Sequence, residues 1–312
     1  LRVDLSEEAF LKQVRDIGVA VIGQTKNLAP ADKTLYALRD VTATVDSLPL
    51  IASSIVSKKL ASGAQGVALD VKTGAGALMH TTEASIELAQ TMVRIGCDAG
   101  RRMMALVTDM GEPLGSHVGN ALEVKEAIDA LSGRVQGPLL EVSLELGARM
   151  LLLADAAASV ADAKQKLMDA LESGRGLERL RAMITAQGGD PACCDDVTRL
   201  PQAPVVQDVP AASSGYVHCM DTVALGNAAQ AMGAGRRVKT DVIDPSVGFV
   251  LHRRIGQRVE AGETIATVYA RDEASAREAS TAIRRCIVLG AEKVPPCKLI
   301  HAIVTNDEVE RL

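Results

Sequence analysis

The feature that most constrains the fold is a strand–helix–strand pattern between residues 66 and 108. Residues 66–72 have the pattern of a strand, a helical stretch follows at 82–100, and residues 103–108 have the pattern of a further strand. Two short buried strands joined by a helix favour a parallel pair, because the helix carries the chain back to the edge where the first strand began. We therefore predict a mixed, largely parallel sheet with covering helices.

The segment before this unit is predicted to be mostly helical. Ser6 is a good cap for a helix at residues 6–17, and the apolar run at 19–23 predicts a short buried strand. Asp32 is the expected cap of a second helix. A third helix is expected at 47–63, where a proline follows the cap.

The second half of the chain changes style at about residue 200. Residues 122–186 are helical in pattern almost throughout, and 200–210 read as a linker. Beyond it, a glycine-punctuated stretch at 255–266 resembles a small β-rich hammerhead. The further elements expected there are strands at 214–221, 248–253 and 265–270, a helix at 274–289 and a strand at 299–304.

These patterns divide the chain into three kinds of structure. Residues 1–25 and 64–203 are assigned to an α/β domain, and residues 26–63 to part of a small helical domain. Residues 204–312 are assigned to a C-terminal β-rich, α+β domain.

Composition excludes several classes of partner. The net charge is -5 and aromatic residues make up 2%, which argues against a nucleic-acid surface. The six cysteines lack CxxC spacing and are expected to be free thiols of a cytoplasmic protein. The sequence has no membrane-length apolar run and no complete phosphate-cradling motif, so we expect no membrane partner and no organic cofactor.

The third predicted helix carries a polar face. Ser54 and Lys58 are four residues apart and therefore lie on one side of a helix, with Lys59 beside them at its C-terminal end. Spacing alone leaves a plain interpretation open: helix-end lysines that suit the dipole, a helical serine, and a surface pair at Arg39 and Asp40.

The sequence around this helix resembles a family signature. Residues 37–45 read ALRDVTATV, and a proline-led helix with Ser54 and then Lys58 follows. This is similar to the signature of the thymidine and pyrimidine-nucleoside phosphorylases, and is closest to the bacterial pyrimidine-nucleoside type. The similarity continues through DVKTGAG at 70–76, TDM at 108–110, PLG at 113–115, GNALEV at 119–124 and AGR at 234–236.

The resemblance implies phosphorolysis of uridine, thymidine and deoxyuridine to a free base and a pentose 1-phosphate, as part of nucleoside salvage. It places Arg39, Ser54 and Lys58 on the pyrimidine base, with Arg39 and Lys58 as the catalytic cations. Negative charge grows on the base as it leaves, and fixed cations stabilise that charge most in the transition state. The resemblance also implies that Val45, Ile51 and Leu78 pack against the base.

A potassium site is a second implication of the resemblance. Leu114, His117 and Glu126 match its ligand positions, two through backbone carbonyls and Glu126 through its carboxylate. His117 departs from the small residue of close relatives, and a loop histidine on the surface is the simpler interpretation of its side chain.

The family's phosphate site has a Lys-x-Ser-Thr-Gly-Gly motif and a Gly-His-Thr-Gly-Gly-Thr stretch, neither of which occurs in these residues. We therefore expect phosphate to bind in an N-terminal segment that is missing here, the complete protein to be a homodimer, and this chain alone to be inactive. Three alternatives stay open: a strict thymidine phosphorylase, a non-catalytic pyrimidine-binding remnant, and a phosphoribosyltransferase.

Overall fold

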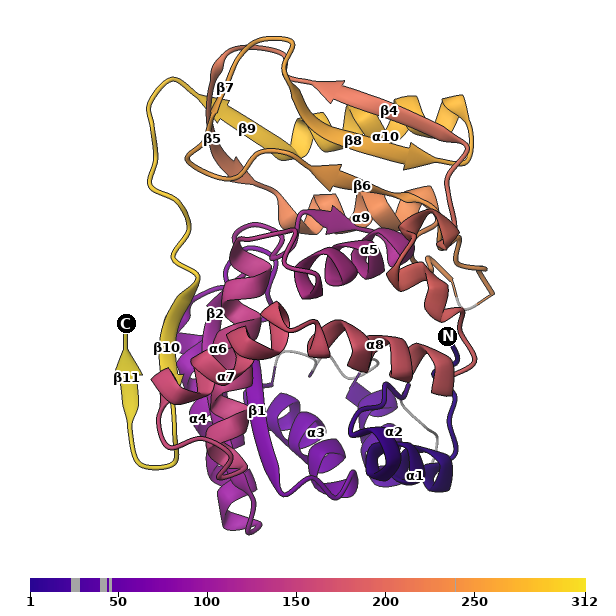
Figure 1. Cartoon of the computed structure of the whole chain (residues 1–312). Helices are drawn as coiled ribbons and strands as arrows, with labels where there is room; N and C mark the ends of the chain where they lie inside the picture. Colours follow the sequence, from indigo (N-terminus) through magenta and orange to yellow (C-terminus); the bar gives the residue numbers. More distant parts are fainter. Residues whose placement is uncertain (24–28, 40–43, 45–46, 239) are drawn as a thin grey trace.

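A computed structural model describes residues 1–23, 29–39, 44, 47–238 and 240–312, with the backbone alone for residues 33 and 36–39. Helices and a mixed sheet form the lower part of the molecule, and antiparallel sheets with two helices form the upper part (Figure 1). The mixed α/β class predicted from the sequence is confirmed.

The N-terminal region consists of α1 (Glu7–Ile17), α2 (Pro30–Arg39) and α3 (Leu48–Ala61). Ser6 caps α1 as predicted, because its side chain accepts the Ala9 N–H. Asp32 is not a cap: α2 begins at Pro30, whose fixed φ suits a first helical position, and this leaves Asp32 in the first turn.

The strand predicted at residues 19–23 is wrong. Both polar groups of Val21 bond to the side-chain amide of Gln187, with N–H to Oε1 at 3.0 Å and Nε2 to the carbonyl at 2.8 Å. Gly23 donates to the Val3 carbonyl at 2.7 Å. Backbone groups of this segment therefore bond to the side chains of Gln13 and Gln187 and to the Val3 carbonyl rather than to a neighbouring strand, and the segment stays partly exposed.

The mixed sheet runs in the order β1-β2-β10-β11. Strands β1 (Gly66–Thr73) and β2 (Arg102–Asp109) are parallel and joined through α4 (Thr82–Asp98), as the sequence predicted. Strands β10 (Ile300–Val304) and β11 (Val309–Arg311) add antiparallel pairs. The sheet is thus less parallel than expected in the part of the chain that is described.

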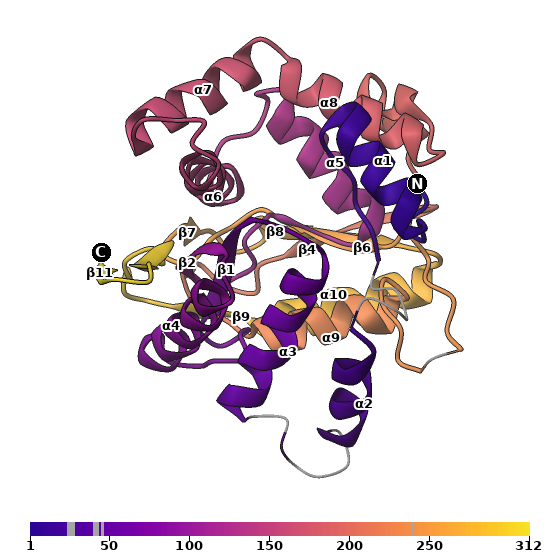
Figure 2. The same ribbon diagram turned by 90° about the horizontal axis from the view of Figure 1, so that it is seen from below.

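Both faces of this sheet are covered (Figure 2). On one face the apolar side chains of β1, β2 and β10 pack against α3 and α4. The other face packs against α6 (Pro138–Leu153). Coverage on two sides explains why β2 is buried almost throughout, whereas β1 alternates and carries Asp70 and Lys72 on one face.

The helical stretch predicted at 122–186 is confirmed as separate helices. They are α5 (Asn120–Leu131), α6, α7 (Val160–Glu172) and α8 (Arg175–Ala186). Two short 3₁₀ turns follow, at Pro191–Cys194 and Val197–Arg199. They pack on α5 and α8 around buried Ile128 and Ile184.

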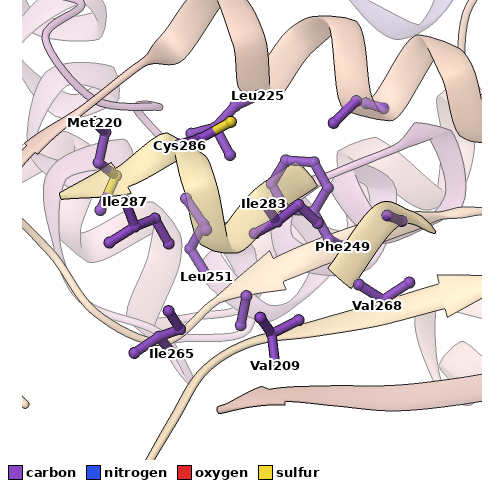
Figure 3. Close-up of a cluster of buried hydrophobic side chains, with 14 of the residues drawn as sticks. Val209, Met220, Leu225, Phe249, Leu251, Ile265, Val268, Ile283, Cys286 and Ile287 are labelled. Atoms are coloured by element: carbon purple, nitrogen blue, oxygen red, sulfur yellow. The ribbon is translucent and has the colours of Figure 1, made fainter. Parts of the chain in front are cut away.

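The C-terminal region holds two antiparallel sheets around the largest buried apolar cluster, with Phe249 at its centre (Figure 3). The predicted linker at 200–210 is partly wrong, because 205–210 form strand β4, and the predicted helical end at 287–289 is strand β9. Helix α9 was not predicted. The elements are β4 (Val205–Pro210), β5 (Gly215–Met220), α9 (Thr222–Met232), β6 (Gly248–Leu251), β7 (Arg258–Val259), β8 (Thr264–Ala270), α10 (Glu273–Cys286) and β9 (Ile287–Gly290).

The two regions exchange strands. The short strand β3 (His117–Val118), which follows β2 in the chain, pairs with β6 of the C-terminal sheet. In the other direction, β10 and β11 leave the 204–312 segment and join the mixed sheet, so that assignment is wrong for the last strands. The boundary near residue 204 stays a prediction.

Two further expectations concern the cysteines and membrane-spanning helices. All six cysteines are free. Among the described residues no helix is both long and apolar enough to cross a membrane.

Candidate functional site

Helix α3 brings Ser54 and Lys58 together as their spacing predicts. The Lys58 ammonium donates to the Ser54 hydroxyl at 2.9 Å and to the Ser54 carbonyl at 3.2 Å. Lys58 also forms an ion pair with Asp32 of α2, with 2.8 Å between Nζ and Oδ2. Ser54 is buried, whereas the Lys58 side chain keeps 25% of its surface exposed.

The rest of the predicted base-binding set is only partly described. Arg39 is the last residue of α2, and its side chain lies outside the described part of the structure, as does Val45. The convergence of Arg39, Ser54 and Lys58 on one pocket therefore stays a prediction, of which the Ser54–Lys58 contact is the visible part.

Ile51 and Leu78 line one cavity of about 170 Å³ between α3, α4 and the β1 strand. Ile51 is 3% exposed and belongs to the core, whereas Leu78 is 53% exposed. An apolar residue with half its surface free is available for contact with a ligand; a core residue forms the fixed wall behind it. The structure thus brings together two of the three side chains predicted to pack against a base.

The segment that carries Leu78 is fixed by the end of β2. Met110 donates to the Thr73 carbonyl at 2.7 Å, and Gly76 donates to the Met110 carbonyl at 3.0 Å. Glycine is required at position 76, because a Cβ there would lie 2.5 Å from Thr222 Oγ1. The turn therefore depends on close backbone approach, as the glycine-rich sequence suggested.

A polar cluster on β1 and β2 was missed in the sequence. Lys72 Nζ donates to Thr108 Oγ1 at 2.9 Å and forms an ion pair with Asp70 at 2.7 Å; Thr108 also donates to Asp70. Thr108 is fully buried. Alternation along β1 places Asp70 and Lys72 on one face, but no sequence signal shows that Thr108 of β2 lies beside them.

The predicted cation ligands lie near one another but are already engaged. Glu126 of α5 is buried and accepts the backbone N–H groups of Ser116 at 2.7 Å and His117 at 3.2 Å. Burial alone would raise the pKa of Glu126, but the His117 imidazole and these N–H groups outweigh it and lower the pKa. The Leu114 carbonyl accepts a hydrogen bond from Nη2 of Arg254 at 2.8 Å.

His117 is not the surface-loop residue that the simpler interpretation expected. It lies in β3 with its ring largely covered, and Nδ1 is 3.5 Å from Glu126 Oε1. In the residues that the structure describes, no cluster of three or more His, Cys, Asp or Glu side chains could hold a metal ion.

Arg254 and Glu112 form a buried charge pair that the sequence reasoning missed. Arg254 Nη1 is 3.4 Å from Glu112 Oε1, and Glu112 accepts the Ile255 N–H at 2.9 Å. Burial raises the pKa of Glu112, although the Ile255 N–H and the Arg254 guanidinium oppose this. The partners are separated by more than a hundred residues, so no local pattern could reveal the pair.

A larger cavity, of about 790 Å³, runs along β1 between α3 and α6. Lys59 and Met150 line it and Leu78 does not, whereas Ser54 and Lys58 line neither of the two cavities. The smaller cavity is therefore the better candidate for a base, since it contains two of the predicted contacts.

Comparison with known proteins agrees with the fold and the motifs. Residues 1–177 match the family model for the a/b domain of the glycosyl transferase family. Residues 216–290 match the model for the C-terminal domain of pyrimidine nucleoside phosphorylase.

Several bacterial pyrimidine-nucleoside phosphorylases are similar to the chain. The protein of Bacillus subtilis (strain 168) is 48% identical over 304 residues, which are 97% of this chain and 70% of the relative. That of Staphylococcus aureus (strain USA300) is 46% identical, with the same coverage. That of Staphylococcus epidermidis (strain ATCC 12228 / FDA PCI 1200) is 49% identical over 86% of this chain and 62% of the relative. This chain, which spans roughly two thirds of the length of these relatives, belongs to the pyrimidine-nucleoside phosphorylase family.

Proposed function

We propose that this chain takes part in the phosphorolysis of pyrimidine nucleosides and supplies the groups that hold the base. The observation that carries the proposal is the Ser54–Lys58 pair, presented by the helix whose Ile51 lines a base-sized cavity opposite Leu78. Similarity to pyrimidine-nucleoside phosphorylases over 97% of the chain supports the reaction class.

In this reaction an oxygen of inorganic phosphate forms a bond to the anomeric carbon while the bond from that carbon to the base nitrogen breaks. The electron pair stays on the base, which then takes up one proton. Until it does, negative charge is spread over the ring nitrogens and carbonyl oxygens. A cation placed at those oxygens lowers the barrier, because its attraction is stronger in the transition state than in the bound nucleoside.

Lys58 has the properties that this role requires. Its ammonium has three donors, and Ser54 and Asp32 hold it toward the α2–α3 side. Asp32 balances its charge, and a developing base anion would compete for the same ammonium. The buried Ser54 hydroxyl is held by Lys58 and is suited to bond the edge of the ring.

The test measures both binding and turnover. Uracil and thymine are titrated against the chain by calorimetry, with Lys58→Ala as comparison. Turnover is measured by chromatography in a hybrid in which this chain replaces the 304 aligned residues of the Bacillus subtilis relative, with uridine, thymidine and deoxyuridine as substrates. We expect phosphate-dependent release of base from all three. Cleavage of thymidine but not uridine would favour a strict thymidine phosphorylase, and base binding with no turnover would favour a pyrimidine-binding remnant.

A homodimer and a cytoplasmic location belong to the same proposal and rest on the family resemblance. Sedimentation of the hybrid protein tests the first, and fractionation of the producing cells tests the second.

A further inference from the structure

The loop that follows β2, residues 110–118, is held from two sides by opposite charges. On one side the Glu126 carboxylate accepts the N–H groups of Ser116 and His117. On the other, the Arg254 guanidinium donates to the carbonyls of Pro113 and Leu114. The Glu126 carboxylate thus accepts from N–H groups and the Arg254 guanidinium donates to carbonyl oxygens, so each charge meets backbone atoms of opposite partial charge.

This arrangement does not fit the potassium site that the family resemblance implies. The Leu114 carbonyl, an expected ligand, already accepts Nη2 of Arg254 at 2.8 Å. A metal ion on the same oxygen would lie close to the guanidinium, and the two positive charges would repel each other. The Glu126 oxygens, moreover, are engaged by backbone N–H groups.

Arg254 is itself firmly held. Its side chain is 19% exposed, Glu112 lies beside it, and its backbone N–H donates to Gln257 Oε1 at 2.9 Å. An arginine stays protonated in any protein environment, and its planar fork matches two neighbouring carbonyls. The charge at this position is therefore permanent and does not depend on the ions in solution.

The loop matters for the base cavity because it supports the segment that carries Leu78. Met110, at the start of the loop, exchanges backbone hydrogen bonds with Thr73 and Gly76. Contacts thus run from Arg254 through residues 110–114 to residues 73–78.

We propose that Arg254 is a built-in cation of this protein: its guanidinium holds the Pro113 and Leu114 carbonyls in place of a bound monovalent metal ion. The loop then keeps its conformation without potassium. This inference deepens the proposed function, because the loop positions the Leu78 segment of the same site.

Thermal unfolding of the purified chain tests the inference. The melting temperature is measured in potassium, sodium and tetramethylammonium chloride at equal ionic strength, for wild type and for Arg254→Gln. We expect the wild type to melt at the same temperature in all three salts. Arg254→Gln should melt about 2–4 °C lower in tetramethylammonium, because the buried Glu112 loses its partner. Potassium should restore part of that loss, since it can bind the freed carbonyls.

Arg253→Gln is the matched control. Arg253 is the neighbouring residue, but it pairs with Glu263 and the His252 carbonyl, both in the C-terminal region. Its loss should lower the melting temperature less, and equally in every salt. A wild type stabilised by potassium but not by tetramethylammonium would overturn the inference. So would an Arg254→Gln protein that melts no lower than Arg253→Gln, or one that loses the same amount in all three salts. None of these measurements uses nucleoside or phosphate, so they stand or fall separately from the proposed reaction.

Discussion

Lys58 and Arg254 are both partly buried cations beside a carboxylate, yet their partners differ in kind. Lys58 contacts Ser54, four residues away on the same helix, and the Asp32 side chain. Arg254 binds two backbone carbonyls about 140 positions earlier in the chain. Lys58 also donates to the Ser54 carbonyl, but within its own helix, whereas Arg254 donates to the carbonyls of a partly buried loop far away in the chain. The two proposals therefore give Lys58 a role in the reaction and Arg254 a role in the scaffold.

The largest effect on catalysis is expected for a substitution at Lys58. In the hybrid protein, Lys58→Ala should lower kcat/KM for uridine about a hundredfold or more, as does the loss of one preorganised charge donor. Its melting temperature should also fall, because Asp32, whose side chain is 9% exposed, loses its ion pair with Lys58. Steady-state kinetics and thermal unfolding of the same preparation supply both numbers.

Lys59→Ala is the control for that variant. Lys59 is the next residue on α3 but lines the larger cavity along β1 instead. We expect near-normal kinetics. An equal loss in both variants would show that the helix end needs positive charge in general rather than Lys58 in particular.

The same comparison explains what could be predicted from the sequence. The Ser54–Lys58 contact follows from helical spacing, and the β1–α4–β2 unit follows from apolar periodicity, because both are local patterns. Local reasoning also placed Ser6 correctly as a cap. The family signature then assigned roles to residues that spacing alone left as an ordinary surface helix.

Long-range partners could not be predicted in this way. The segment at 19–23 has the composition of a strand but is bonded by the Gln187 side chain. Residues 205–210 read as part of a linker, yet they pair with β8 at the edge of a sheet, where Pro210 is tolerated. The Glu112–Arg254 pair leaves no periodic trace, so the structure was needed to show that Leu114 already has a cationic partner.

A substitution at Gly115 tests whether the Glu126 contacts hold the loop at residues 110–118. A Cβ on this residue would lie 2.3 Å from Glu126 Oε2, so the carboxylate must move and release the N–H groups it accepts. Gly115→Ala should lower the free energy of unfolding by about 1–3 kcal/mol. Urea denaturation gives the value.

Gly226→Ala is the matched glycine variant. Gly226 lies inside α9, and a Cβ there would meet no atom within 4 Å. Alanine should therefore be neutral or stabilise by about 0.5–1 kcal/mol, since it favours the helix. If Gly115→Ala is equally harmless, the Glu126 contacts do not hold the loop.

The two carboxylates of the loop should respond to pH in opposite senses. The folded pKa of Glu126 is lowered, so its contribution is present above the ordinary value of 4.5 and is lost as pH falls through the folded pKa. The folded pKa of Glu112 is raised, so its contribution is present below 4.5 and is lost as pH rises through the folded pKa.

Urea denaturation from below pH 4.5 up to about pH 7 should therefore separate Glu126→Gln from Glu112→Gln. The stability of wild type over Glu126→Gln should grow with pH below about 4.5 and then stay level, whereas that of wild type over Glu112→Gln should shrink above about 4.5. Parallel curves for the two variants would mean that Arg254 and the backbone N–H groups hold both carboxylates alike, which contradicts the division between them.

The smallest effect of a substitution is expected at Leu78, which is connected both to the helix of Lys58 and to the loop that Arg254 binds. Its side chain faces the cavity lined by Ile51 of α3, while its segment rests on the loop that Arg254 holds. Leu78→Ala removes an apolar contact from a residue that is already 53% exposed, so folding should be nearly unaffected. Uracil binding should weaken by about fivefold, the equivalent of about 1 kcal/mol of lost apolar contact. Calorimetric titration of Leu78→Ala and Met150→Ala decides between the two cavities, because Met150 is exposed to a similar degree but lines the larger one. Weaker binding in the Met150 variant alone would move the base to the groove along β1 and separate it from both Lys58 and Arg254.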